Sequence, residues 1–136
     1  MPKVVGIDHL SIRVSDFAAS KAFYGKLMPF LRFEVLDEYD DAIGWTNGQT
    51  RLWIGQSEPG RRKTHHIGDV GFHHYAFQLE SRADVDALQA FVKDELRATI
   101  VDPAAEYYED SYAVFFLDPD GLKLEGMKYG ERTAKP

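Results

Sequence analysis

Three residues of types that bind metal ions each lie in a short segment where apolar and polar residues alternate. His9 and His74 open two such segments, and Glu125 lies within a third near the C-terminus. Two imidazoles and one carboxylate form the facial pattern of metal sites that leaves coordination positions open for water, substrate or oxygen. Glu125 is also the residue we expect to act in catalysis. The three residues therefore predict a catalytic divalent metal.

The other histidines are expected to have structural or surface roles. His73 is adjacent to His74, and alternation along a strand allows only one of the two to share the polar face. His65 and His66 follow a basic stretch and are expected to be solvated. The sequence has no cysteine, so a transition-metal site must use histidine and carboxylate.

An internal repeat explains why the three candidate ligands stand at matched places. Residues 9–14 match residues 74–79 position by position: histidine, apolar, small, apolar, long polar, aliphatic. A helix start follows each copy, with Asp16 as an N-cap signal in the first and Ser81 opening a capping-box-like start in the second. Residues at helical spacing follow, namely Phe17, Ser20, Tyr24 and Leu27 up to about Pro29, and then Val85, Leu88 and Val92.

Three further strands are predicted after each helix. They span residues 33–37, 42–46, 51–55, 99–101, 112–117 and 122–127, with turns at Asn47-Gly48 and at residues 118–121. The shared order βαβββ predicts an α+β fold of two modules. The modules span residues 4–56 and 71–129, with an exposed linker at 57–70 and a tail at 130–136.

Alternation assigns the residues of these strands to two faces. The polar set is expected on the face away from the helices: His9, Ser11, Arg13, His74, Ala76, Gln78, Lys123, Glu125 and Met127. A module of about 60 residues with one helix on one sheet face is marginal alone. We therefore expect the two curved mixed sheets to pair into a polar-lined cup around the metal.

Composition excludes several classes of partner. The chain has 136 residues, a net charge of -6 and 44% hydrophobic residues, which favours one folded domain and disfavours binding to nucleic acid. No apolar stretch approaches the roughly 18 residues of a membrane span. The first residues lack the long apolar region of a secretory signal, so a cytoplasmic protein is expected.

The sequence resembles the vicinal-oxygen-chelate superfamily, which includes glyoxalase I, fosfomycin-resistance thiol transferases, extradiol dioxygenases, methylmalonyl-CoA epimerase and bleomycin-resistance proteins. The resemblance extends over about residues 4–127, and four segments carry it: residues 7–16, 20–24, 72–77 and 113–125. It implies paired βαβββ modules, a divalent metal held by His9, His74 and Glu125, and a small-molecule substrate that binds the metal through two oxygens. It also implies a homodimer.

The sequence departs from the glyoxalase I pattern at one ligand. Glyoxalase I adds a carboxylate from its fourth strand. Aligning Gly55 with Gly126 places Ile54 opposite Glu125, and sliding by one residue places Trp53 there. Neither side chain binds a metal, so the resemblance favours the members that use three ligands over a conventional glutathione-dependent glyoxalase I.

Further residues are expected to contact the substrate. Alternation places Ser11, Arg13, Gln78 and Lys123 in the cup, where a cation could hold an anionic substrate and a hydroxyl could orient it. Arg13 and Lys123 could instead pair with nearby acids. The aromatic candidates are Trp53, Tyr107, Tyr108 and Tyr112, with Tyr107 and Tyr108 in a loop or at a strand start.

Two kinds of function remain open from the sequence, besides a structural or regulatory domain with a vestigial site. The first is an enzyme in which Fe, Mn, Ni, Co or Zn acts as a Lewis acid, working as a lyase or isomerase, a thiol transferase or a dioxygenase. The second is a non-catalytic protein that sequesters a ligand or antibiotic, of the bleomycin-resistance type. Because such binding proteins typically lack the metal ligands, the three candidates favour the enzyme.

Overall fold

The computed structural model describes residues 1–131 and divides the chain into two compact units. Unit 1 comprises residues 1–64, and unit 2 begins at His65.

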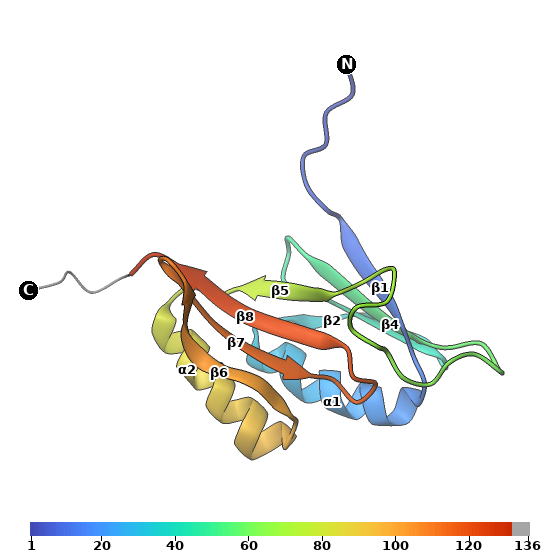
Figure 1. Cartoon of the computed structure of the whole chain (residues 1–136). Helices are drawn as coiled ribbons and strands as arrows, with labels where there is room; N and C mark the ends of the chain where they lie inside the picture. The colour runs from blue at the N-terminus through green and yellow to red at the C-terminus, as the bar shows by residue number, and fades with distance from the viewer. Residues whose placement is uncertain (132–136) are drawn as a thin grey trace, which may run out of the picture. The chain divides into compact units, whose positions relative to one another are not determined.

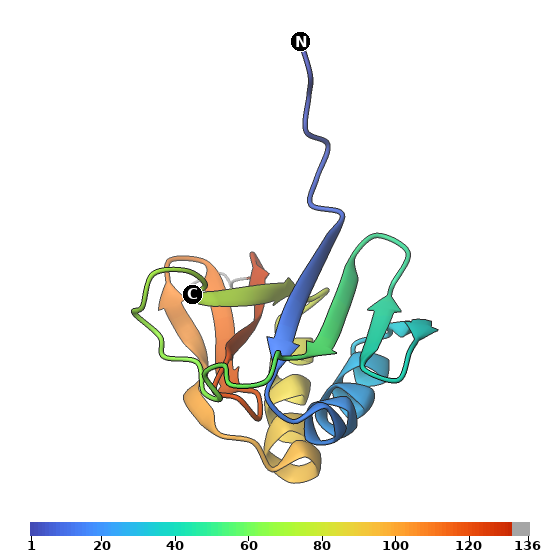
Figure 2. The ribbon, with the colours of Figure 1, turned by 90° about the vertical axis from the view of Figure 1, so that its right-hand side faces the viewer.

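Unit 1 is a four-stranded mixed sheet with one helix. Its elements are β1 (His9–Val14), α1 (Phe17–Phe30), β2 (Glu34–Glu38), β3 (Ala42–Thr46) and β4 (Arg51–Gln56). The strand order is β1-β4-β3-β2. As Figure 2 shows, β1 and β4 run in the same direction, whereas β3 runs against β4.

Unit 2 repeats this topology with a different sequence (Figure 1). Its elements are β5 (His74–Gln78), α2 (Arg82–Phe91), a π-helical turn η1 (Val92–Leu96), β6 (Ile100–Tyr108), β7 (Ser111–Leu117) and β8 (Lys123–Tyr129). The strand order β5-β8-β7-β6, with β5 parallel to β8, matches that of unit 1 strand for strand. The predicted α+β fold with two βαβββ modules is confirmed.

Both helices begin at the predicted caps. The Asp16 carboxylate accepts a hydrogen bond from the backbone N–H of Ala19 at 3.1 Å, and the Ser81 hydroxyl accepts one from Asp84 at 3.0 Å. These bonds satisfy backbone donors that a helix leaves unpaired at its first turn. The buried helix positions are Ser20, Phe23, Tyr24, Leu27 and Met28 in α1, and Val85 and Leu88 in α2.

Each helix covers one face of its own sheet, which leaves the other face to the polar residues. In unit 2, α2 contacts β6, β7 and β8, and a side chain added at Gly126 would collide with Leu88 of that helix. Leu124, two residues before Gly126, is completely buried. Since alternate residues point to opposite faces, Lys123 and Glu125 lie on the face away from α2, as predicted.

Strand β6 differs most from the sequence prediction. It spans nine residues, whereas only residues 99–101 were expected to be extended. The pairing of β6 with β7 shifts register three times, and Pro103 lies within β6. The sequence of this strand therefore lacks the strict alternation and the proline-free run that would predict it. Tyr107 and Tyr108 therefore end a strand instead of lying in a loop or at a strand start. The other strands begin and end within two residues of the expected limits.

Residues 57–70, where the sequence predicted a linker, are largely irregular and exposed, but one histidine among them is partly buried. The backbone N–H of His65 donates to the carbonyl of Asp120 at 3.0 Å, and its Nε2 is buried without a hydrogen-bond partner among residues 1–131. The expected solvation of His65 is therefore wrong, whereas His66 is exposed. Of the expected tail at 130–136, residues 132–136 lie outside the described part of the chain.

Within residues 1–131, none of the helices combines the length and the apolar character needed to cross a membrane.

Candidate metal centre

Two of the three expected ligands lie side by side on the open face of the sheet in unit 2. In the parallel pairing of β5 with β8, His74 is opposite Lys123 and Ala76 is opposite Glu125. His74 and Glu125 are therefore diagonal neighbours on one face. The imidazole Nε2 lies 3.9 Å from the carboxylate Oε1, and the side chains are 34% and 14% exposed.

The donor pair fits a divalent transition metal. Such an ion binds imidazole nitrogen and carboxylate oxygen at about 2 Å each. The two donor atoms lie 3.9 Å apart, so a small turn of either side chain would bring both to one ion. Two protein ligands leave further positions for another residue and for substrate. Within residues 1–131, no three histidine, aspartate or glutamate side chains gather closely enough to hold an ion.

The surroundings of this pair disfavour both charged forms. Burial lowers the pKa of His74, and electrostatic interactions with His73 and Lys123 lower it further. Burial also raises the pKa of Glu125, although Lys123 opposes that shift. Both shifts disfavour a pair of an imidazolium and a carboxylate at this 3.9 Å contact. A neutral imidazole is the form that binds a metal ion, and a bound cation would compensate the buried carboxylate.

Aromatic rings form the wall beside the pair. Phe115 of β7 is opposite Glu125, and its ring meets the His74 ring edge-on at a centroid distance of 5.9 Å. The Lys123 ammonium lies 4.6 Å from the centre of the same ring, and the Tyr107 ring lies 6.0 Å from it. Sequence reasoning missed Phe115, although its place on the strand next to Glu125 was the signal that could have found it.

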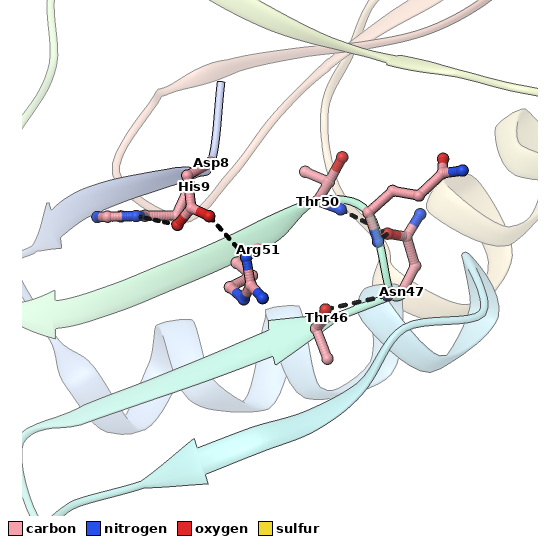
Figure 3. Close-up of polar contacts among 8 residues, drawn as sticks. Asp8, His9, Thr46, Asn47, Thr50 and Arg51 are labelled. Carbon is pink, nitrogen blue, oxygen red and sulfur yellow. Dashed lines mark hydrogen bonds and ion pairs between the residues drawn. The ribbon is translucent and has the colours of Figure 1, made fainter. Parts of the chain in front are cut away.

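In unit 1, His9 is held by a hydrogen-bonded chain of side chains, drawn in Figure 3. Its Nδ1 lies 2.8 Å from Oδ2 of Asp8, and Oδ1 of Asp8 accepts a hydrogen bond from Arg51 at 2.8 Å. The hydrogen bond with His9 and the charge of Arg51 lower the pKa of Asp8. This leaves Nε2 as the nitrogen of His9 that a metal could use. Sequence reasoning missed Asp8 and Arg51, although Asp8 directly precedes the expected ligand.

The strand register identifies Trp53 as the counterpart of Glu125 in unit 1. Trp53 is opposite Ser11 in β1, as Glu125 is opposite Ala76 in β5. The alignment that placed Ile54 there is therefore wrong by one residue, and the alternative with Trp53 is correct. The indole ring lies over Gly44 and stacks on Tyr39 at a centroid distance of 6.3 Å. No carboxylate occupies this position.

Four of the residues expected to contact the substrate lie on the same sheet face as the histidine of their own unit. Ser11 and Arg13 share the face of His9 in β1, with the Arg13 guanidinium over Gly55. Gln78 and Lys123 share the face of His74 in unit 2, with Gln78 opposite Met127.

Tyr112 lies on the other face of the unit 2 sheet. Its hydroxyl donates to Asp86 of α2 at 2.6 Å, and the Arg82 guanidinium stands over its ring at 5.3 Å. A substrate contact beside His74 does not fit this placement. Tyr107 donates its hydroxyl to the Pro103 carbonyl, whereas Tyr108 is 77% exposed.

Comparison with known proteins finds a matching family profile and similar bacterial proteins. Residues 6–125 match the family profile of the Glyoxalase/Bleomycin resistance protein/Dioxygenase superfamily. Uncharacterized protein YqjT of Bacillus subtilis is 32% identical over 86% of this chain and 94% of its own length. Metallothiol transferase FosB of Bacillus licheniformis is 28% identical over 90% of this chain and 75% of its own length.

A solved structure shows the same fold. The glyoxylase/bleomycin resistance protein/dioxygenase domain from Frankia sp. EAN1pec superposes with a TM-score of 0.77 and 21% identity, over 94% of this chain and all of that one.

Proposed function

Because this chain belongs to the Glyoxalase/Bleomycin resistance protein/Dioxygenase superfamily, we propose that it is a metal-dependent enzyme acting on a small molecule that presents two oxygens. His74 and Glu125 of unit 2 provide two of the metal ligands. We further propose His9 as a metal ligand because the resemblance implies it. The observation that carries the proposal is the 3.9 Å separation of an imidazole nitrogen and a carboxylate oxygen on the open sheet face.

A divalent ion of Fe, Mn, Ni, Co or Zn bound there would act as a Lewis acid on a substrate oxygen. The chain's own residues would do the rest. The ring of Phe115 excludes water from one side of the pair, which strengthens electrostatic interactions there. Lys123, held over that ring, provides a cation for an anionic substrate oxygen. Glu125 is also the residue that we propose to act in catalysis, since its carboxylate lies beside His74 on the open sheet face.

Two observations support a choice among the classes of reaction that we propose. Trp53 at the counterpart position of Glu125 favours a site with three protein ligands over a conventional glyoxalase I, for which the resemblance implies a further carboxylate. The similarity to a protein named metallothiol transferase supports a metal and favours thiol transfer among the lyase, transferase and dioxygenase classes. We propose Arg13, Ser11 and Gln78 as further substrate contacts, since all three are exposed on the ligand-bearing strands.

Calorimetric titration of metal-stripped protein with Zn²⁺ and Mn²⁺ tests the proposal. The wild type should bind one ion per chain, and Glu125→Gln and His74→Ala should each weaken binding by at least tenfold. Glu80→Gln and His66→Ala are matched controls, because both residues are exposed and neither lies on the open sheet face. Equal binding by all five proteins, or none by the wild type, would contradict a metal at this pair.

A second candidate function is the sequestering of a flat ligand without turnover. The observation that favours it is the stack of Trp53 on Tyr39 in unit 1, an aromatic surface on the same sheet face as Ser11 and Arg13. If this function is correct, metal-stripped protein should still bind aromatic ligands with quenching of tryptophan fluorescence. Trp53→Leu would then abolish binding, and Glu125→Gln would not affect it.

A further inference from the structure

We propose that Asp8 and His73 are positioning residues that hold the two ligand imidazoles in the form whose Nε2 can bind the metal. Each directly precedes a ligand histidine, and each has a side-chain atom 2.8 Å from Nδ1 of that histidine. The inference rests on the proposed metal site, and it adds two residues that are not themselves ligands.

The contact between Asp8 and His9 defines the tautomer of His9. An ionised carboxylate has only acceptor sites, so the Nδ1 that it contacts must carry the hydrogen. A neutral imidazole protonated on Nδ1 has its lone pair on Nε2. The bond also fixes the orientation of the ring and increases its basicity, as carboxylates beside metal-binding histidines do.

Arg51 keeps Asp8 in place. It binds the second oxygen of the Asp8 carboxylate at 2.8 Å, and it lies opposite His9 in the pairing of β1 with β4. The hairpin before β4 holds this register, because the Asn47 side chain accepts hydrogen bonds from the backbone of Gln49 and Thr50 (Figure 3). Asp8 is therefore linked to the sheet as well as to the adjacent residue, in a contact whose Arg51 and Asp8 side chains are 42% and 70% exposed.

The contact between His73 and His74 provides the equivalent in unit 2. Their Nδ1 atoms are 2.8 Å apart, so one ring donates the hydrogen and the other accepts it. The Nε2 of His74 faces Glu125, and a metal at that nitrogen requires the hydrogen on Nδ1 of His74. His73 must then accept through its own Nδ1 and carry its hydrogen on Nε2.

The repeat supports treating the two pairs as one device. Asp8 and His73 precede the two histidines that open matching strands, and Arg51 and Lys123 lie opposite those histidines in matching registers. The acceptors differ, since one is a charged carboxylate and the other a neutral ring. Hydrogen bonds to a charged acceptor are about twice as strong as neutral ones. The tautomer and ring orientation of His9 should therefore depend more on Asp8 than those of His74 depend on His73.

The first test is ¹⁵N NMR of the metal-free protein, which reports the hydrogen on each ring nitrogen directly. We expect His9 and His74 with hydrogen on Nδ1 and His73 with hydrogen on Nε2. Asp8→Ala should release His9 into a mixture of tautomers, whereas Asp8→Asn should keep the tautomer, because its amide oxygen still accepts. A wild-type His9 with hydrogen on Nε2 would overturn the inference without any variant.

The second test is the affinity for Zn²⁺ by calorimetry. Asp8→Ala and His73→Ala should weaken binding by about 10- to 100-fold. Asp8→Asn and His73→Asn should recover most of the loss, and the exposed controls Asp40→Ala and His66→Ala should have no effect. Alanine variants that bind as tightly as a binding-competent wild type would refute the positioning role and leave the metal site intact. A wild type that binds no metal would overturn the proposed function and, with it, this positioning role, whereas wrong tautomers in a protein that binds metal would overturn the positioning role alone.

Discussion

At the scale of single residues, the environment of His74 and Glu125 matters more than their identity. Partial burial removes water from both groups, and the charge of Lys123 favours the ionised form of Glu125. Burial also lowers the pKa of the His74 imidazole, which favours its neutral form. Each group is thus in a state that a divalent cation stabilises. A surface pair of the same residues would instead be solvated and would contribute little.

Tyr112 provides a test that separates stability from metal binding. Tyr112→Phe removes a 2.6 Å hydrogen bond to Asp86, so we expect a loss of about 1 kcal/mol in the free energy of unfolding. Metal affinity should not change, because Tyr112 lies on the face covered by α2. Chemical denaturation and calorimetric titration of the same variant check both statements. A metal affinity lowered tenfold would contradict the assignment of Tyr112 to the helix face.

The stabilisation by Tyr112 should also depend on pH in a defined direction. The hydrogen bond to Asp86 raises the pKa of the phenol above its ordinary value of 10.0. A pKa that is higher in the folded than in the unfolded state stabilises the fold fully below the unfolded value. The difference in stability between wild type and Tyr112→Phe should therefore persist at neutral pH and disappear as the pH rises above about 10.

The individual site residues were predictable to different degrees. His74, Glu125 and Lys123 share one face because strict alternation runs through β5 and β8, and a sequence displays alternation directly. The contacts of Asp8 with Arg51 and of Phe115 with His74 depend on which strands are neighbours. Alternation within one strand does not give these contacts. The predicted turn at residues 118–121 brings Phe115 beside Glu125, whereas the contact of Asp8 with Arg51 required the sheet order.

At the scale of elements, the two sheets fill the same positions with opposite residue sizes. In unit 1 the central strand β4 carries the large Trp53 and its neighbour β3 carries Gly44, with the indole over the glycine. In unit 2 the central strand β8 carries the smaller Glu125 and its neighbour β7 carries Phe115. One sheet thus presents an aromatic surface where the other presents the carboxylate that we propose as a metal ligand.

Gly44→Ala tests this packing. An added Cβ would lie 2.5 to 2.7 Å from atoms of the Trp53 ring, so we expect a loss of about 1–3 kcal/mol in the free energy of unfolding. The loss should be smaller in the background of Trp53→Ala, where the ring is absent. Gly25→Ala is the control. Gly25 lies within α1, and a Cβ added there would meet no atom within 4 Å apart from its own helix backbone, so this change should stabilise the protein by up to about 1 kcal/mol. Equal effects of Gly44→Ala in both backgrounds would show that the ring does not lie over the glycine.

The elements themselves were mostly predictable, and the exceptions have local causes. Asp16 and Ser81 announce the helices because their side chains cap the first turn. The π-helical turn at Val92–Leu96 was missed, since it continues the helix without a new sequence signal. The length of β6 was missed because its pairing with β7 is irregular.

At the scale of the whole molecule, we propose that the protein is a homodimer. The segment before β1 exposes Val4, Val5 and Ile7, whose exposed fractions are 85%, 95% and 76%. Contiguous exposed apolar side chains are typical of surfaces that bind another protein. Light scattering during size-exclusion chromatography should give twice the chain mass of 15.5 kDa. A single-chain mass in protein that carries a full equivalent of metal would contradict the dimer.

The fold defines the superfamily, but it does not define the reaction. One scaffold can support several chemistries, since the activity depends on the site and not on the strand order. For this chain, the distinguishing features are the absence of a carboxylate at Trp53 and the presence of Lys123 beside the ligand pair. Substrate searches should therefore begin with small anionic oxygen compounds and a thiol.

The most direct measurement of the central claim is the metal content of protein purified without a metal-affinity column. Elemental analysis should find about one equivalent of a transition metal in the wild type. His9→Ala, His74→Ala and Glu125→Gln should each lose it, and His66→Ala should retain it. A wild type that stays metal-free after incubation with each candidate ion, or a Glu125→Gln variant with undiminished metal, would contradict the account.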